Sequence, residues 1–186
     1  MSNAAITFQK SIKGAEELLE RFDEEKLTPS AHNAEVLKRA GYITAVAAWD
    51  TYLKDRMREE ISIWLSAMQG SPIANFVFSQ SEEDLRRFNS PNSPNTKQLF
   101  KKYFNVDLTQ SWVWDNYDSL QSKQFLNAII SKRGDAAHQA NKHHGSSNEP
   151  HLIKRDEFEK AIRFLKGLVA ATDKAALANT LHRSET

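Results

Sequence analysis

Apolar residues recur along this chain at spacings of three and four, and alternation with a period of two is hard to find. Spacings of three and four place apolar side chains on one face of an α-helix. Six glycines and five prolines are few for the length, so long segments contain nothing that would interrupt a helix. The pattern predicts an all-α protein, an up-and-down helical bundle of about five main helices.

The first half of the chain contains two strongly patterned segments. A helix is predicted from about residue 6 to residue 25, where one stripe steps by four and three and the other face is acidic; the stripe is Phe8, Ile12, Ala15, Leu19 and Phe22. A long helix is predicted from about residue 33 to residue 68, with an apolar stripe that drifts in phase, as an unsupercoiled helix requires. Gly41 allows a bend in it.

The segment from residue 73 to residue 118 is less regular. The stretch "IANFVF" reads equally well as a buried helical turn or a strand, and "SEEDLRRF" and "TKQLFKKYF" predict two short helices. The aromatic residues Trp112, Trp114 and Tyr117 lie close together in the sequence. Aromatic rings can stack on RNA bases, but such clusters more often pack a loop onto the core, and we favour packing.

Two further helices are predicted in the last third of the chain. The first runs from about residue 119 to residue 132, with an apolar face formed by Leu120, Phe125, Leu126, Ile129 and Ile130. The last begins near Asp156, where Asp156 and Glu159 have capping-box spacing. We expect one domain over residues 1–186, with residues 1–4 and 182–186 disordered.

Composition narrows the possible classes of protein. The 186 residues are 40% hydrophobic and 26% charged, with a net charge of +1, so no global field indicates a nucleic-acid-binding or membrane protein. No apolar run is long enough to span a bilayer, and we expect no membrane association. The absence of cysteine excludes disulfides and thiolate zinc sites, and it fits a cytoplasmic location.

The stretch "IISKRGDAAHQANKHHG", residues 129–145, carries the candidate chemistry. From residue 121 to residue 145 there are four basic side chains against one acidic side chain, Asp135, and four of the six histidines lie between His138 and His151. A local positive field with titratable imidazoles suits an anionic substrate. No usual metal-ligand spacing joins the histidines, so we expect neither a metal nor another cofactor, and we give His143 and His144 no catalytic role.

The spacing of Arg133 and His138 sets a geometric condition. Five positions apart on a straight helix, two side chains point about 140° away from each other and cannot share one substrate atom. Two arrangements would remove this difficulty. In the first, the helix breaks at Gly134 and Asp135 caps the next turn. In the second, two copies of the chain meet so that each site is shared.

The segment "RGDAAH" is similar to the R-x4-6-H motif of the HEPN superfamily, with Arg133, four residues and then His138. The neighbouring segments agree, because "AGYITAVAAWDTYLKDRMREEI" resembles the long second helix of RiboL-PSP-type HEPN domains and the segment from residue 153 resembles their final helix. The resemblance extends over about residues 5–178. The motif alone is weak, and its value comes from its position between those helices.

The resemblance implies a metal-independent endoribonuclease that works as a homodimer, in the setting of a toxin or a phage-defence effector. His138 would be the general acid and base, and Arg133 would hold the scissile phosphate while the ribose 2′-hydroxyl attacks. Asp135, Lys132, Asn141 and Lys142 would support the site or bind RNA. The expected partners are RNA, a second copy, and an antitoxin or another defence-system protein.

One departure weakens this expectation. Active members usually have a polar residue directly after the arginine, whereas this chain has Gly134 there and the acidic Asp135 one position later. Either Asp135 performs the orienting role or the site is weakened. The alternative function is therefore a catalytically inactive HEPN module that binds a partner protein or RNA.

Overall fold

The computed structural model describes residues 1–25, 31–139 and 153–183, except for the side chains of residues 31–33, 137–139 and 177–183. The described residues form helices without any strand, which confirms the all-α prediction. The elements are α1 (Asn3–Glu25), α2 (Ala31–Trp64), the 3₁₀ helix η1 (Ser66–Met68), α3 (Pro72–Arg87), α4 (Ser93–Phe104), the 3₁₀ helix η2 (Leu108–Ser111), α5 (Ser119–Gln139) and α6 (Arg155–Arg183).

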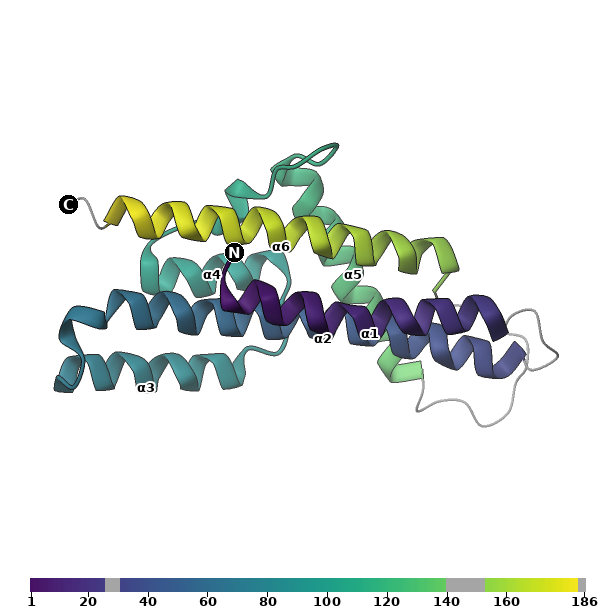
Figure 1. Ribbon diagram of the computed structural model, residues 1–186, viewed down its shortest axis with the longest axis horizontal. Coiled ribbons are helices and arrows are strands. Elements are labelled where there is room, and N and C mark those ends of the chain that lie inside the picture. The colour runs from purple at the N-terminus through teal and green to yellow at the C-terminus, as the bar shows by residue number, and fades with distance from the viewer. Residues whose placement is uncertain (26–30, 140–152, 184–186) are drawn as a thin grey trace.

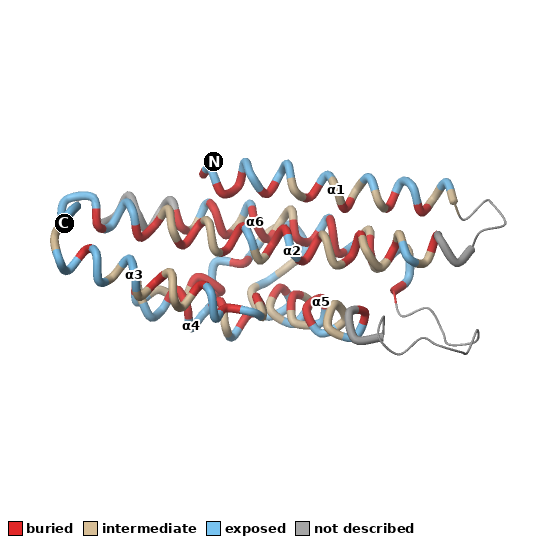
Figure 2. Tube along the Cα trace, turned by 90° about the horizontal axis from the view of Figure 1, so that it is seen from below, coloured by how far each residue is buried: buried red, intermediate tan, exposed pale blue. Residues whose placement is uncertain are grey.

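The long helices α1, α2 and α6 lie side by side along the long axis of the molecule, with α6 running in the same direction as α2 and against α1 (Figure 1). The helix α5 crosses them steeply in this view. The helices α4 and α5 lie on the opposite side of α2 from α1 (Figure 2). The buried positions of α2 therefore point toward neighbours on both sides.

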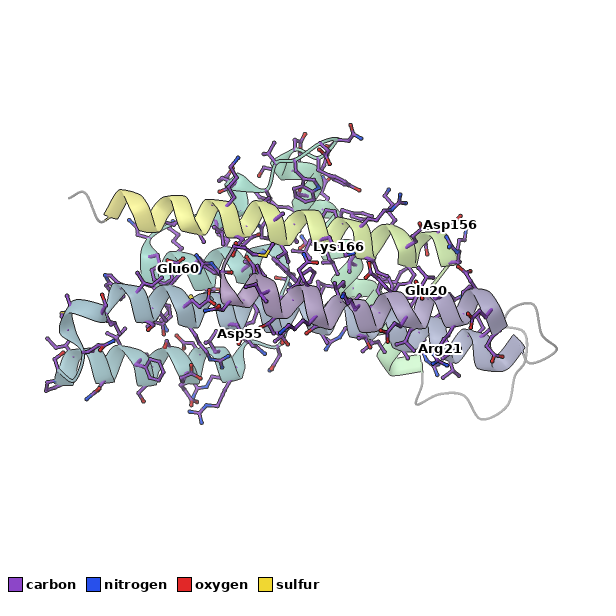
Figure 3. All side chains as sticks on the ribbon, in the orientation of Figure 1. Glu20, Arg21, Asp55, Glu60, Asp156 and Lys166 are labelled. Atoms are coloured by element: carbon purple, nitrogen blue, oxygen red, sulfur yellow. The ribbon has the colours of Figure 1, made fainter. Side chains whose placement is uncertain are left out.

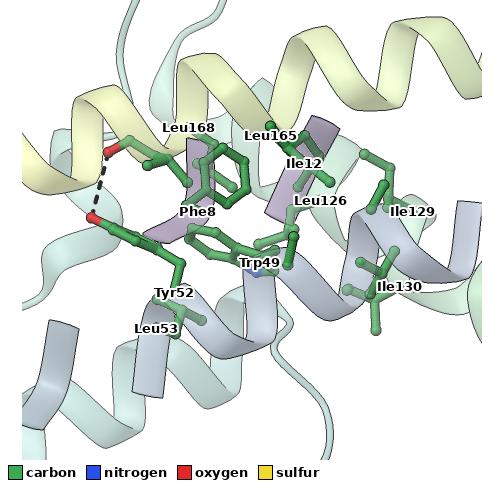
Figure 4. Close-up of a cluster of buried hydrophobic side chains, with 14 of the residues drawn as sticks. Phe8, Ile12, Trp49, Tyr52, Leu53, Leu126, Ile129, Ile130, Leu165 and Leu168 are labelled. Atoms are coloured by element: carbon green, nitrogen blue, oxygen red, sulfur yellow. Dashed lines mark hydrogen bonds between the residues drawn. The ribbon is translucent and has the colours of Figure 1, made fainter. Parts of the chain in front are cut away.

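The centre of the core is the place where α1, α2, α5 and α6 meet (Figure 4). The side chains that meet there include Phe8, Ile12, Trp49, Leu53, Leu126, Ile129, Leu165 and Leu168. Burying a side chain of this size contributes about 1.5–3 kcal/mol, so the contact with α5 is strongly favourable. The Tyr52 hydroxyl donates to the Val169 carbonyl oxygen over 3.5 Å. The predicted stripe of α1 is buried throughout.

Two glycines allow helices and loops to approach closely. A Cβ at Gly41 of α2 would lie 2.5 Å from Cζ of Phe158 on α6, and one at Gly167 of α6 would lie 2.3 Å from Nε1 of Trp114. Both distances are far shorter than van der Waals contact, so no other residue fits without displacing an aromatic ring. Helix α2 continues through Gly41, which lets α6 pack closely against it.

The N-terminus is held in place, contrary to the expected disorder of residues 1–4. The Ser2 hydroxyl accepts a hydrogen bond from the Ala5 N–H over 3.0 Å, so Ser2 is the N-cap of α1. The Ser2 N–H in turn donates to Asp173 of α6 over 3.0 Å, and the Ala4 N–H donates to Glu59 of α2 over 2.7 Å. Of the other expected tail, residues 184–186 lie outside the described residues.

The structure corrects several predicted boundaries. "IANFVF" and "SEEDLRRF" belong to one helix, α3, whose N-cap Ser71 accepts from the Ala74 N–H over 3.1 Å. Helix α2 ends at Trp64, and η1 forms a separate 3₁₀ turn. Leu120, placed on the buried face of its helix, is 63% exposed because it lies nine positions before the buried Ile129 and so on the opposite face of α5.

The start of α6 is capped differently from the prediction. Glu157 reaches back and accepts from the Lys154 N–H over 3.0 Å, whereas Glu159 pairs with Arg155. The acidic half of the capping box is therefore Glu157, three positions after Lys154. The buried side of this helix runs from Phe158 to Thr172. None of the helices, over the residues that the structure covers, combines the length and the apolar character needed to cross a membrane.

Candidate functional site

The second half of α5 carries the candidate residues, and it is one uninterrupted helix. The helix extends from Ser119 to Gln139 and passes through Gly134 without a break. A Cβ at Gly134 would meet nothing within 4 Å, and its φ is not in the left-handed region. The first of the two arrangements, a break at Gly134, is therefore absent, and Asp135 caps no new helix. The cost of glycine in a helix, about 0.5–1 kcal/mol, is too small to stop a helix that is anchored on both sides of it.

Helix continuity determines how Arg133 and His138 are placed. Both belong to α5, so their positions differ by about 140° around its axis and by roughly 7.5 Å along it. Of the two arrangements that would join them, only the one that needs a second copy of the chain is compatible with this helix. The side chain of His138 and the residues Asn141 and Lys142 lie outside the described residues.

Buried apolar residues anchor α5 beside these positions. Ile129 and Ile130 are buried before Arg133, and Ala136 is buried after it. The Tyr42 hydroxyl of α2 donates to the Ile129 carbonyl oxygen over 3.5 Å. Burial, and then the negative charge of Glu157, raises the pKa of Tyr42, so this hydroxyl stays protonated at neutral pH. The backbone around Arg133 is thus positioned by the core.

Lys132 connects this part of α5 to the start of α6. Its Nζ lies 2.6 Å from Oε2 of Glu157, the residue that also caps α6 through the Lys154 N–H. The hydrogen bond from Lys132, followed by the one from Lys154, lowers the pKa of Glu157. Lys132 was predicted to support the site or bind RNA, and the structure gives it an ion pair within the chain.

Arg133 and Asp135 have no such partner. Arg133 is half-buried and Asp135 is exposed, and neither makes a hydrogen bond or an ion pair with any part of the chain that the structure covers. Asp135 therefore does not hold the guanidinium of Arg133 within this chain. An unpaired, half-buried guanidinium beside a fixed helix is suited to binding an anionic oxygen from outside the chain.

The predicted aromatic cluster packs onto the core. Trp112 is fully buried and meets Trp49 edge to face, with 6.1 Å between ring centroids. Trp114 and Tyr117 are half-buried and both contact Phe164 of α6, at centroid distances of 5.3 and 5.2 Å. The packing prediction is confirmed, and Trp112 has no exposed face for a base.

A buried charged cluster lies between α2 and α6, and it was not singled out from the sequence; Glu60, labelled in Figure 3, is one of its members. Arg56 is 1% exposed; its Nη1 lies 2.8 Å from Oε2 of Glu59, its Nη2 donates to Glu60, and its Nε lies 3.6 Å from Oδ1 of Asp173. The available signal was that Leu53, Arg56, Met57 and Glu60 fall on one helical face. The structured part of the chain contains no group of three histidine, aspartate or glutamate side chains able to hold a metal ion.

The chain is similar in sequence to a known protein family. A family model described as RiboL-PSP-HEPN matches residues 10–178 of the chain. The match includes all of α2 and α5 and most of α6. No curated protein and no solved structure matches the chain.

Proposed function

This chain belongs to the RiboL-PSP-HEPN family, and from that membership we propose that it is an endoribonuclease that cuts single-stranded RNA without a metal ion. The observation that carries the proposal is the half-buried guanidinium of Arg133 on a core-anchored helix, five positions before His138 and unpaired among the described residues. These two residues have the spacing of the family's R-x4-6-H motif, and we propose them as its arginine and histidine.

In the proposed reaction the ribose 2′-hydroxyl oxygen attacks the adjacent phosphorus. A bond forms from the 2′-oxygen to phosphorus while the bond from phosphorus to the 5′-oxygen breaks, which leaves a 2′,3′-cyclic phosphate and a 5′-hydroxyl. His138 takes the proton of the 2′-hydroxyl, and an imidazole gives a proton to the leaving 5′-oxygen. Imidazole can act as both base and acid because it titrates near neutral pH. Arg133 binds the phosphate oxygens and stabilises their developing charge.

We further propose that the active form is a homodimer. Helix α5 is continuous, so Arg133 of one copy and His138 of the other act on the same phosphate only when the ends of two α5 helices meet. A toxin or a phage-defence effector is the setting that family membership suggests, with an antitoxin or another defence-system protein as a further partner.

The alternative proposal is an inactive module of the same family that binds a partner protein or RNA. It is favoured by Gly134 in the position after the motif arginine and by Asp135, which makes no contact with Arg133 within the described chain. The two proposals differ in whether RNA is cut.

The test is a cleavage assay with purified protein, labelled single-stranded RNA and EDTA. We expect cyclic-phosphate ends, no cleavage of a DNA strand of the same sequence, and a loss of at least ~100-fold in rate for His138→Ala and for Arg133→Ala. Arg163→Ala, which removes an exposed arginine of α6, is the charge-matched control and should cut normally. Cleavage by both motif variants at the wild-type rate would refute the enzyme proposal.

A further inference from the structure

One segment of this chain is unusually free of charge. Every residue from 61 to 81 is uncharged, although the chain has 25 basic and 24 acidic residues, and no other stretch without a charged side chain is as long. The segment covers the end of α2, all of η1 and the first part of α3. These elements form a helical hairpin at one end of the molecule (Figure 1). We name this part of the hairpin, residues 61–81, the neutral tip.

The neutral tip exposes large apolar side chains. Of the large hydrophobic residues that are exposed in the described chain, six lie here: Ile63 (48%), Trp64 (45%), Met68 (41%), Ile73 (65%), Phe76 (69%) and Phe78 (48%). An aromatic side chain has roughly 150–250 Å² of surface, so the three rings alone expose about 300 Å². Large apolar side chains exposed together at one end of a molecule indicate an interaction site.

Trp64 packs edge to face against Phe104 of α4, with 6.2 Å between ring centroids, but packing within the chain does not account for the exposed residues of α3. Helix α3 buries only Ala74, Ser81 and Leu85, all on the side opposite to Ile73 and Phe76 or near its end. Ile73 and Phe76 are three positions apart and share one outward helical face. The energetic cost of leaving both exposed is removed only by contact with another molecule.

The charges that border the neutral tip are already satisfied within the chain. Before the tip, Glu59 and Glu60 pair with Arg56. After it, Glu82 pairs with Arg58 over 2.8 Å, and Glu83 pairs with Arg86 and Arg87. Neither an anionic nor a cationic partner would find an uncompensated charge here, which argues against RNA and against an anionic surface at this end of the molecule.

We propose that the neutral tip is a self-association surface on which a second copy of this chain docks. In a twofold interface each patch meets itself, so a charged patch would meet its own charge, whereas an uncharged patch meets no repulsion. The exposed rings would form the apolar centre of a contact that needs about 800 Å² from each copy, and the paired charges would form its polar rim.

This surface is separate from the end of α5 that carries Arg133. Tyr42 contacts Ile129 of α5 and lies 22 positions before Trp64 on α2, a separation of about 33 Å along the helix. Figures 1 and 2 show the neutral tip and the end of α5 toward opposite halves of the molecule. Docking through the tip alone would therefore not bring two Arg133–His138 segments together. With both contacts formed, the assembly is larger than a dimer.

The test is the solution mass of the whole chain by light scattering over a range of protein concentrations. We expect the wild type to associate and the double variant Ile73→Glu/Phe76→Glu to lose one step of association, with the association constant lowered at least ~10-fold. Leu120→Glu, which changes an equally exposed apolar residue on α5, is the matched control and should keep the wild-type mass. Circular dichroism of each variant verifies the fold.

The outcomes separate this proposal from the proposed function. A monomeric wild type, or a double variant with the wild-type mass at every concentration, would overturn self-association through the tip. RNA cleavage is measured on the same samples. A protein that cuts no RNA yet loses mass in the double variant refutes the nuclease and supports the tip. A protein that cuts RNA, and whose double variant keeps the wild-type mass, supports the nuclease and refutes association through the tip.

Discussion

Lys132 and Glu157 join the second half of α5 to the first turn of α6, with 2.6 Å between Nζ and Oε2. Glu157 therefore has two roles, because the same carboxylate accepts the Lys154 N–H that begins α6. Lys132 directly precedes Arg133 in the sequence, so the ion pair fixes the turn of α5 next to Arg133. The stability that this ion pair contributes depends on pH.

The hydrogen bond from Lys132 lowers the pKa of Glu157 in the folded protein. A lowered carboxyl pKa gives stability that is present above the unfolded value of about 4.3 and is lost as the pH falls through the folded value. Glu157→Gln should therefore lower the melting temperature at pH 7, and the difference from the wild type should shrink as the pH falls below the unfolded value. Because the Glu157 side chain is 43% exposed, we expect an effect below about 1 kcal/mol. Glu17→Gln, at an exposed position of α1, is the control for thermal unfolding at both pH values.

Gly134→Ala tests whether the glycine after the motif arginine has a conformational role. The new Cβ would meet nothing within 4 Å, and the position is helical, so we expect a gain of about 0.5–1 kcal/mol in the free energy of unfolding. RNA cleavage, if present in the wild type, should be retained. Urea unfolding and the cleavage assay measure the two effects, and a loss of cleavage with a stable fold would mean that α5 must bend at Gly134 to work.

Gly167→Ala should destabilise the protein by about 1–3 kcal/mol, even though alanine is the better helix former. The added Cβ would lie 2.3 Å from Nε1 of Trp114, and that ring is held by Tyr117 and Phe164. Gly14→Ala is the matched control, because its Cβ would lie 3.8 Å from Cγ2 of Thr44, an ordinary contact. We expect Gly14→Ala to stabilise, and equal effects of the two changes in urea unfolding would contradict the packing described for Trp114.

Arg56→Ala should be the most destabilising of these changes, at about 3–5 kcal/mol. The substitution would leave Glu60 and Asp173 buried without the guanidinium that neutralises them. Arg86→Ala removes an arginine that is 72% exposed and pairs with Glu83, and we expect it to change the free energy of unfolding by less than about 0.5 kcal/mol. Similar values for the two variants in urea unfolding would show that the buried cluster is not needed for stability.

The helices were readable from the sequence because the amphipathic repeat is a local property. The stripe of α1 and the buried side of α6 follow directly from spacings of three and four. The start of α6 was misplaced because Lys154 is not a usual capping residue and so gives no signal. Arg56 could not be singled out from the sequence, because only the fold brings Glu60 and Asp173 around it.

The candidate site was predictable only in part, for a geometric reason. The spacing in the sequence proposes Arg133 and His138 as a pair, but it does not reveal whether Gly134 breaks the helix. That depends on the burial of Ala136 and on the tie from Lys132 to α6, both of which are tertiary contacts. The neutral tip was visible as an uncharged run, yet only the fold shows that Ile73 and Phe76 face outward.

Helix α3 is attached to the body mainly by polar bonds, from Arg58 to Glu82 and from Asp84 to Lys102 and Tyr103. Helices held in this way open in excursions that cost less than global unfolding. The backbone amides of α3 should therefore exchange with deuterium before those of α2, and faster at high salt, which screens the ion pairs. A hairpin that opens at low cost adjusts its shape to what it meets, so docking at the neutral tip should appear first as slower exchange along α3.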